Sequence, residues 1–265
     1  MERGMISETT CRTALNPSQI PGADWCLNPY RGCSHACVYC YAGCLARKRG
    51  ETREWGSFVE ARTNIQDRLI VQVKRPKQGT VLLSTLTDAY QAAEARYGLT
   101  ARCLSVLAFT ELGVSVLTKS DLVRRDLPLL KALKGAVVGF SLTTADDSLA
   151  ELLEPGAPPP SRRLSALRDL AQAGIRTWVF VAPVIPGLTD APEELAKIFR
   201  AARAAGARAV ELDPFNFYPA AVSRVRELIH RPDQRAAFES ACRDPKAFRR
   251  SVRQTLSAEI RRCPR

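Results

Sequence analysis

The chain is poor in several residue types and has no long apolar run, and these absences exclude several classes of protein. Its 265 residues include two histidines, two methionines and three tryptophans. No apolar run approaches the roughly 20 residues that a membrane helix needs, and the first ten residues lack the apolar core of a signal peptide. We therefore expect a cytoplasmic protein without a membrane partner. Hydrophobic residues make up 46% and charged residues 25% of the chain, a balance that excludes a disordered protein.

Acidic residues are fewer than basic ones, 27 against 39, which gives a formal net charge of +12. The basic residues are mostly arginine and are scattered along the chain. Their densest groups, at residues 47–49, 249–250 and 261–262, are short. This scatter is typical of a solvated surface, so nucleic acid stays an alternative partner and is not the favoured one.

Short apolar runs alternate with amphipathic stretches along most of the chain. The runs are nearly continuous and rich in β-branched residues, which predicts parallel strands covered on both faces. They lie at residues 80–84, 114–118, 136–143, 177–184 and 209–212, and we expect a first strand at residues 24–30, just ahead of the cysteine cluster. Helical patterns with ordinary start and stop signals lie between them, at residues 100–112, 161–173 and 192–205.

Six strands are too few for the eightfold barrel of about 250 residues. We therefore predict an α/β fold, a partial (β/α)6 barrel with a short N-terminal segment, in which the strands' carboxyl ends meet at one mouth. After Tyr218 the pattern changes to charged helix, at residues 222–229 and again from 234 to 262. This divides the chain into a barrel domain, residues 1–220, and a helical C-terminal cap, residues 221–265.

The most specific signal is the segment at residues 28–41, NPYRGCSHACVYCY. It places Cys33, Cys37 and Cys40 at spacings of four and three residues, so three thiolates can converge on one soft metal centre. A structural zinc site needs four ligands, usually two short-spaced cysteine pairs, and no second pair is visible. Iron–sulfur clusters are held by thiolates, and three from the protein leave one iron open to an outside ligand.

This pattern, with Tyr39 before the last cysteine, resembles the radical SAM superfamily. The resemblance implies that Cys33, Cys37 and Cys40 hold a catalytic [4Fe–4S] cluster whose open iron is chelated by S-adenosylmethionine. It implies reductive cleavage to a 5′-deoxyadenosyl radical, with electrons from a donor such as flavodoxin or ferredoxin. By the same resemblance Tyr39 would approach the adenine, and His35 would lie near the cluster.

Further motifs resemble the spore-photoproduct-lyase-like branch of that superfamily: STLTDAYQ at residues 84–91, LTKS at 117–120, LEP at 153–155 and RL at 163–164. Carried over, the resemblance places cofactor-binding residues at the strand ends, with Lys119 on the methionine carboxylate. The set is Ser84, Thr87, Asp88, Lys119, Ser141, Thr143 and the apolar Val184. Asp213, Asn216 and Tyr218 follow the last strand and are candidates for contacts to a polar substrate, with loop packing as the alternative.

Six cysteines fall outside the motif. Cys103 lies on the apolar side of a predicted helix, which indicates packing. The other five are candidate ligands of an auxiliary [4Fe–4S] cluster, with buried or incidental thiols as the alternative, because their spacing matches no known motif. They are Cys11, Cys26, Cys44, Cys242 and Cys263.

An auxiliary cluster suggests sulfur insertion, as in the biotin- and lipoyl-synthase types of the superfamily. We therefore expect sulfur transfer to a small nucleoside- or sugar-like substrate, as in albomycin-type antibiotic pathways. The alternative is a radical SAM lyase acting on nucleic-acid lesions. That reading is opposed by residues 83–88, which contain no counterpart of the hydrogen-donating cysteine that the lyases carry near the end of the second strand.

Overall fold

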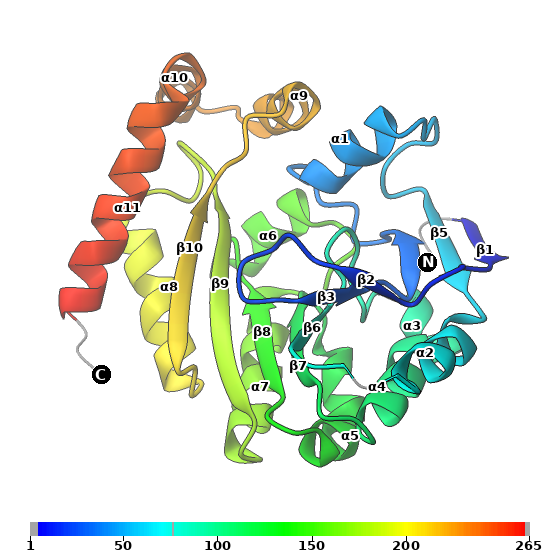
Figure 1. Cartoon of the computed structure of the whole chain (residues 1–265). Coiled ribbons are helices and arrows are strands. Elements are labelled where there is room, and N and C mark those ends of the chain that lie inside the picture. Colours follow the sequence, from blue (N-terminus) through cyan, green and yellow to red (C-terminus); the bar gives the residue numbers. More distant parts are fainter. Residues whose placement is uncertain (1–4, 76, 263–265) are drawn as a thin grey trace.

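The computed structural model describes residues 5–75 and 77–262, and within them six parallel strands form the centre of the molecule (Figure 1). They are β3 (Trp25–Leu27), β6 (Thr80–Leu83), β7 (Gly113–Thr118), β8 (Val137–Ser141), β9 (Arg176–Val184) and β10 (Ala209–Pro214). The sheet runs in the order β10-β9-β8-β7-β6-β3-β2, and β2 (Leu15–Pro17) is antiparallel to β3 at one edge. The predicted α/β partial barrel is confirmed.

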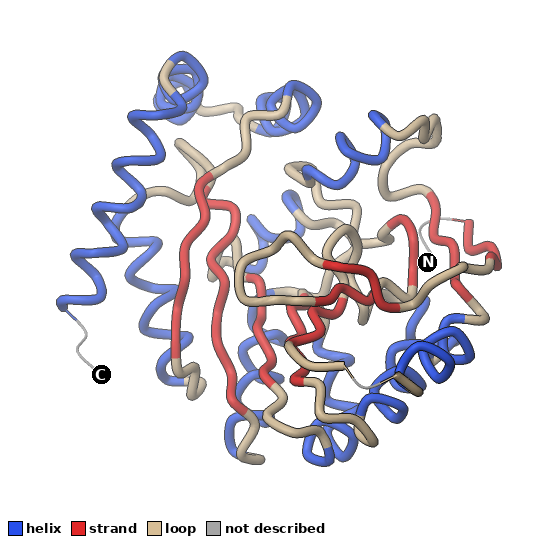
Figure 2. Tube along the Cα trace, viewed as in Figure 1, coloured by secondary structure: helices blue, strands red, loops and turns tan. Residues whose placement is uncertain are grey.

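Helices lie around the outside of this curved sheet, and Figure 2 shows the strands as an inner layer. They are α2 (Ile65–Val73), α3 (Ala93–Tyr97), α4 (Leu99–Leu107), α5 (Leu127–Ala132), α6 (Asp147–Leu153), α7 (Pro160–Gln172) and α8 (Pro192–Ala204), with a 3-10 turn at Asp121–Asp126. The helix predicted at residues 100–112 is shorter: it ends at Leu107, and Gly113 already begins β7.

Burial alternates along β6 and β7, which corrects for these strands the prediction that both faces are covered, whereas the last four residues of β8 are all buried. Val81 and Leu83 of β6, and Val114 and Val116 of β7, are fully or almost fully buried in the main core, whereas the residues between them are only half-buried. The reason is that one face packs against the helices and the other faces the inside of an open barrel. That inner face is the place for a ligand.

The N-terminal region differs from the prediction. The strand expected at residues 24–30 is divided at Asn28-Pro29 into β3 and β4 (Tyr30–Gly32), which belong to different sheets. A proline offers no N–H to a ladder and restricts the residue before it, so the chain leaves the first sheet there. β4 pairs with β5 (Phe58–Arg62), and β5 pairs with β1 (Met5–Thr9), in a small second sheet.

Helices α9 (Pro219–Leu228), α10 (Pro232–Arg243) and α11 (Pro245–Arg262) follow the barrel, and each begins with a proline. The charged helix predicted from residue 234 to 262 is therefore two helices, separated at Asp244. α11 lies along β10 and α8, so it covers the edge of the sheet (Figure 1). No helix in the described part of the chain combines the length and apolar character needed to cross a membrane.

Candidate active site

A pocket opens at the carboxyl ends of the parallel strands, beside the loop that carries the cysteine motif. The loop and each of β6 to β10 contribute to its lining. The side chains concerned include Cys33, His35, Cys37, Tyr39, Cys40, Tyr41, Ser84, Thr87, Asp88, Leu117, Lys119, Ser141, Phe180, Ala182, Asp213 and Asn216. The fold thus gathers most of the residues that the sequence indicated, because parallel strands end at the same edge.

The three motif thiols are buried in this pocket. Cys33 and Cys37 are 8% and 7% exposed, and Cys40 is half-buried. Burial, with the charge of Asp88, raises the pKa of Cys33 to about 12. Burial also raises the pKa values of Cys37 and Cys40, where the charge of Lys119 opposes it. Thiolates are the form that binds metal, so this environment needs a cationic centre to ionise them.

A four-iron cubane fits this donor set better than a single ion does. Within the residues described, no three His, Cys, Asp or Glu side chains are grouped tightly enough to chelate one metal ion. The cysteines of a cubane sit on different irons and therefore lie further apart than the ligands of one ion. Three thiols lining one pocket, with no fourth cysteine among its lining residues, suit a cluster with one open iron.

The cysteine loop, residues 30–41, is shaped by polar contacts from the segment after β6. Gly32 has φ +76°, and a Cβ there would lie 2.3 Å from the Phe58 carbonyl oxygen, so only glycine fits. Gln91 accepts a hydrogen bond from the Ser34 N–H at 2.8 Å and donates to the Gly32 carbonyl at 3.2 Å. The Thr87 hydroxyl donates to that same carbonyl. Thr87 therefore supports the loop while it also lines the pocket.

Residues 153–156 hold the loop from its other side. The Val38 N–H donates to the Leu153 carbonyl, and the Gly156 N–H donates to the His35 carbonyl, each at 3.0 Å. A Cβ on Gly156 would lie 2.0 Å from the Ser34 carbonyl oxygen. The two backbones approach so closely that no side chain can be placed between them.

Replacing Gly156 by alanine should therefore lower the free energy of unfolding of the metal-free chain by about 2–3 kcal/mol, the upper range for an overpacked interior. The matched control is Gly113→Ala, whose new methyl would meet its nearest atom, Thr80 Oγ1, at 3.3 Å. Urea denaturation measures both. Equal losses in the two variants would contradict the importance of this close approach.

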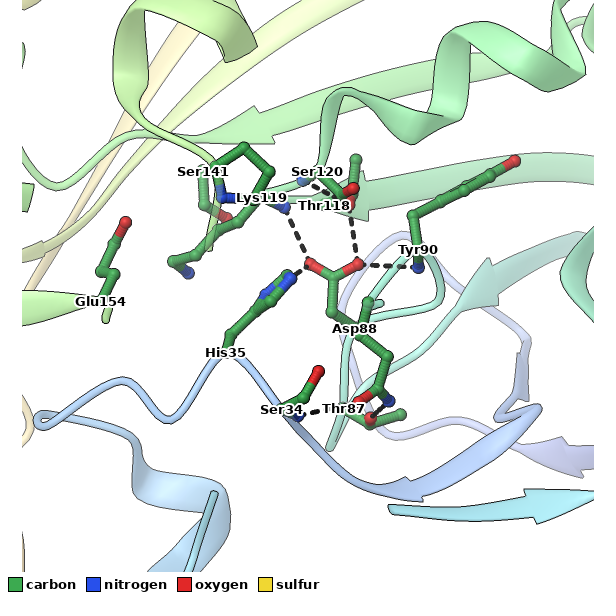
Figure 3. A network of polar contacts seen from close by, with 12 residues as sticks. Ser34, His35, Thr87, Asp88, Tyr90, Thr118, Lys119, Ser120, Ser141 and Glu154 are labelled. Carbon is green, nitrogen blue, oxygen red and sulfur yellow. Dashed lines mark hydrogen bonds and ion pairs between the residues drawn. The ribbon is translucent and has the colours of Figure 1, made fainter. Parts of the chain in front are cut away.

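Asp88 is the centre of a polar network beneath the pocket (Figure 3). Its carboxylate accepts hydrogen bonds from the Tyr90 N–H at 2.8 Å, the Thr118 hydroxyl at 2.7 Å and the Lys119 N–H at 2.8 Å. His35 Nδ1 lies 3.5 Å from Asp88 Oδ2, the oxygen that also accepts from the Lys119 N–H, and burial lowers the pKa of His35 despite that neighbour. Asp88 thus fixes the backbone at the end of β7, from which the Lys119 side chain extends into the pocket.

Lys119 brings a cation into the pocket. Its ammonium lies 5.7 Å from the centre of the Tyr39 ring and makes no ion pair with a carboxylate of the described residues. Burial opposes its charge, but the negative charges of Cys37 and Glu154 keep the pKa of Lys119 above its usual value. An unpaired, fixed cation in a pocket is suited to an anionic ligand group such as a carboxylate.

Ser84 is an unusual residue at the end of β6. It is 7% exposed, has φ +62°, and its buried hydroxyl has no hydrogen-bond partner among the described residues. Left-handed backbone at a residue other than glycine and an unsatisfied buried hydroxyl both cost free energy, and they cluster at ligand sites. Ser84 was predicted as a strand-end residue, but no sequence pattern indicates this backbone conformation.

Of the indicated cofactor and substrate residues, three do not line the pocket: Val184, Thr143 and Tyr218. Tyr218 packs against a second apolar cluster, which is the loop packing given as the alternative. Val184 is fully buried at the end of β9, and Thr143 lies behind Tyr39, where its hydroxyl is 2.9 Å from the Tyr39 hydroxyl.

The sequence analysis assigned no role to Glu154 and Arg163, although both belong to quoted motifs. Their side chains are 1% and 0% exposed and form an ion pair next to Tyr39. Burial of two charges is the signal of their importance, and it is not readable from sequence.

The remaining cysteines are dispersed. Cys103 is fully buried on α4, as expected for a packing residue, and Cys11 contacts the same core. Cys242 is on α10 and packs in a second apolar cluster with α9. Since β1, which precedes Cys11, and α10 lie at opposite sides of the molecule (Figure 1), one cluster cannot take both. Cys26 is on β3, Cys44 is on α1 (Tyr41–Lys48), and Cys263 lies outside the described residues.

Comparisons with known sequences link this chain to one protein family. A sequence model of the radical SAM superfamily matches residues 27–201. An uncharacterised protein of Mycobacterium tuberculosis is 36% identical over 258 residues, covering 84% of this chain and 73% of that protein. One from Methanocaldococcus jannaschii is 35% identical over 185 residues, 70% of each.

Among solved structures, spore photoproduct lyase with bound AdoMet and dinucleoside spore photoproduct superposes with a TM-score of 0.71 at 17% identity, over 97% of this chain and 78% of that one. Streptococcus suis SuiB bound to S-adenosylmethionine gives 0.53 at 15% identity, over 77% and 45%. At these low sequence identities, both similarities concern the fold alone.

Proposed function

Because this chain belongs to the radical SAM superfamily, we propose that its pocket at the carboxyl ends of β6 to β10 holds a [4Fe–4S] cluster and S-adenosylmethionine for hydrogen abstraction from a polar substrate. The observation that carries the proposal is the meeting of three buried thiols with the unpaired cation of Lys119 in one pocket. The test is dithionite-dependent release of 5′-deoxyadenosine, which should require Cys37.

In this proposal Cys33, Cys37 and Cys40 hold three irons, and the fourth is left for the cofactor. Bound there, the cluster supplies the electron that splits S-adenosylmethionine and releases the hydrogen-abstracting 5′-deoxyadenosyl radical. Lys119 binds the methionine carboxylate, and the Ser84 hydroxyl, which has no partner in residues 5–75 and 77–262, binds a polar group of the same ligand. A small electron carrier such as flavodoxin or ferredoxin serves as the reductant.

The substrate proposed for the mouth is nucleoside- or sugar-like. Asp213 and Asn216 line the pocket beyond the cysteines, and the Tyr41 hydroxyl lies at its rim, where it donates to the Thr85 carbonyl at 2.8 Å. Burial raises the pKa of Asp213, against the lowering effect of Arg249 and Arg253 on α11. Carboxyl, amide and hydroxyl groups around an apolar wall that includes Leu117 and Phe180 suit a compact ligand with several hydroxyls.

The finer proposal is sulfur insertion, with an auxiliary [4Fe–4S] cluster as the sulfur donor. Its support is the presence of five cysteines beyond the motif and Cys103, and its requirement is that a subset of them come together. The alternative is a lesion lyase, supported by the likeness of fold to spore photoproduct lyase. Against the lyase, the cysteines lining the pocket in the described residues are the three of the motif, so none is left as a hydrogen donor.

Iron and acid-labile sulfide separate these two readings. After anaerobic reconstitution, sulfur insertion predicts about eight of each per chain, whereas a single cluster gives about four, from the stoichiometry of a cubane. The triple variant Cys11→Ala/Cys26→Ala/Cys44→Ala should then fall to about four. A count of about four in both the natural and the triple-variant protein would exclude a sulfur-donating cluster on these residues.

A further inference from the structure

The cysteine loop, residues 30–41, is tied into the fold at both ends by the same arrangement of side chains. Near each end a buried tyrosine binds a buried glutamate, and that glutamate pairs with an arginine. We name the two sets the Tyr30 triad (Tyr30, Glu94 and Arg125) and the Tyr39 triad (Tyr39, Glu154 and Arg163).

The polar groups of the Tyr39 triad are buried, and each member is hydrogen-bonded. The Tyr39 hydroxyl donates to Glu154 Oε1, and Arg163 Nη2 donates to Glu154 Oε2. The Arg163 side chain also donates to the Ser141 carbonyl at 3.0 Å and to the Pro158 carbonyl at 2.7 Å. Every partner of the guanidinium is thus fixed, and the glutamate holds the phenol in one position.

This triad joins the cysteine loop to the strands that form the pocket. Arg163 anchors it to the carboxyl end of β8 through Ser141. Thr143 donates to Glu154 at 2.9 Å, and its hydroxyl lies 3.2 Å from the Ala182 carbonyl of β9. The Tyr39 ring itself lines the pocket, with the Lys119 ammonium over it. The Tyr39 hydroxyl is therefore held by residues that are themselves bonded to β8 and β9.

The Tyr30 triad has the same chemistry away from the pocket. The Tyr30 hydroxyl donates to Glu94, which also accepts from the Thr100 N–H at 2.9 Å and pairs with Arg125 at 2.6 Å. Tyr30, Glu94 and Arg125 are absent from the residues that line the pocket. The molecule therefore contains its own control for the effect of the arrangement on folding alone.

We infer that the Tyr39 triad holds the Tyr39 ring as a rigid wall of the S-adenosylmethionine site, so that Glu154 and Arg163 are positioning residues for cofactor binding, whereas the Tyr30 triad only anchors the loop. The inference rests on the proposed function. Its physical basis is preorganisation: a ring fixed during folding does not have to be ordered when the ligand binds, and the ammonium over its face keeps its place.

The experiment compares Tyr39→Phe with Tyr30→Phe, which delete the same hydroxyl from the two triads. Both variants are reconstituted anaerobically beside the natural protein. Binding of S-adenosylmethionine, the EPR spectrum of the reduced cluster with and without it, and urea unfolding of the metal-free chains are measured. We expect Tyr39→Phe to weaken cofactor binding about tenfold, the order of the cost of immobilising one side chain when a ligand binds, and to change the cofactor-dependent spectrum.

Tyr30→Phe should leave binding within about twofold of the natural protein while it lowers stability to a similar extent, since it too removes a buried hydrogen bond to a charge. Unchanged binding and spectrum in Tyr39→Phe would overturn the inference, and so would equal weakening in both variants. Should Tyr39→Phe take up no iron, Thr143→Val removes another hydroxyl from the same carboxylate, and unchanged binding in that variant overturns the inference. If the natural protein loads iron but binds no S-adenosylmethionine, the proposed function fails instead.

Discussion

Replacing Cys37 by alanine should abolish the dithionite-dependent release of 5′-deoxyadenosine from S-adenosylmethionine. Cys37 is 7% exposed, and burial raises its thiol pKa well above the ordinary value, so its ionised form depends on a bound cationic centre. A methyl group offers no ligand, and no other cysteine is among the residues lining the pocket beyond Cys33 and Cys40. Iron content should fall by about four per chain, the content of one cubane.

The matched control is Cys103→Ala, which makes the same chemical change at a fully buried thiol on α4, outside the pocket. This variant should keep its iron and its cofactor cleavage and lose only packing. Formation of 5′-deoxyadenosine by Cys37→Ala at the natural rate would mean that the three thiols do not hold the reacting cluster. Loss of activity in both variants, with folding intact, would also contradict the assignment.

Much of the site was predictable because it depends on local patterns and one geometric rule. The spacing of Cys33, Cys37 and Cys40 lies within a single loop, and Lys119 and Ser141 lie at the ends of apolar runs that are recognisable as strands. Parallel strands end at a common edge, so these distant residues had to meet there. The sequence order of the strands from β6 to β10 is also their order in the sheet, the simplest outcome for consecutive βα units.

What could not be predicted depends on pairing between distant segments. The small sheet joins β1 to β5 and β5 to β4, and no pattern in Met5–Thr9 selects that partner. Gly156 supports the cysteine loop because the two backbones approach so closely that a Cβ on Gly156 would lie 2.0 Å from the Ser34 carbonyl oxygen. Similarly, Glu154 and Arg163 are charged residues, which a sequence reader places at the surface, and only the tertiary structure reveals that both are buried.

Arg163→Met should be the most destabilising single change outside the cluster ligands. The Arg163 and Glu154 side chains are 0% and 1% exposed, so the variant leaves a carboxylate in the interior without its main partner. Breaking a buried pair in this way costs about 3–5 kcal/mol, whereas replacing both members by neutral groups costs much less. The double variant Glu154→Gln/Arg163→Met should therefore be more stable than Arg163→Met in urea unfolding of the metal-free chain.

The cost should also depend on pH, with a sign that follows from the Glu154 carboxyl. In the natural protein burial opposes ionisation, but Arg163 and Lys119 hold the pKa of Glu154 below its usual value. The pair thus stabilises the fold above the unfolded pKa, and that stability is lost as pH falls through the lowered folded pKa. Without Arg163 burial has less opposition and the pKa rises, so the variant gains stability as Glu154 takes up a proton.

The stability difference between Arg163→Met and the natural protein should accordingly be larger near pH 8 than near pH 5, which is roughly one unit above the ordinary pKa of a carboxyl side chain. The double variant lacks the carboxylate, so its difference from the natural protein should change less over the same range. A deficit in Arg163→Met that is independent of pH, or one as large in the double variant, would show that the arginine acts through its packing volume. In that case Arg163 would stabilise the fold by filling the space beside Glu154, Ser141 and Pro158, and its hydrogen bonds to them would contribute little.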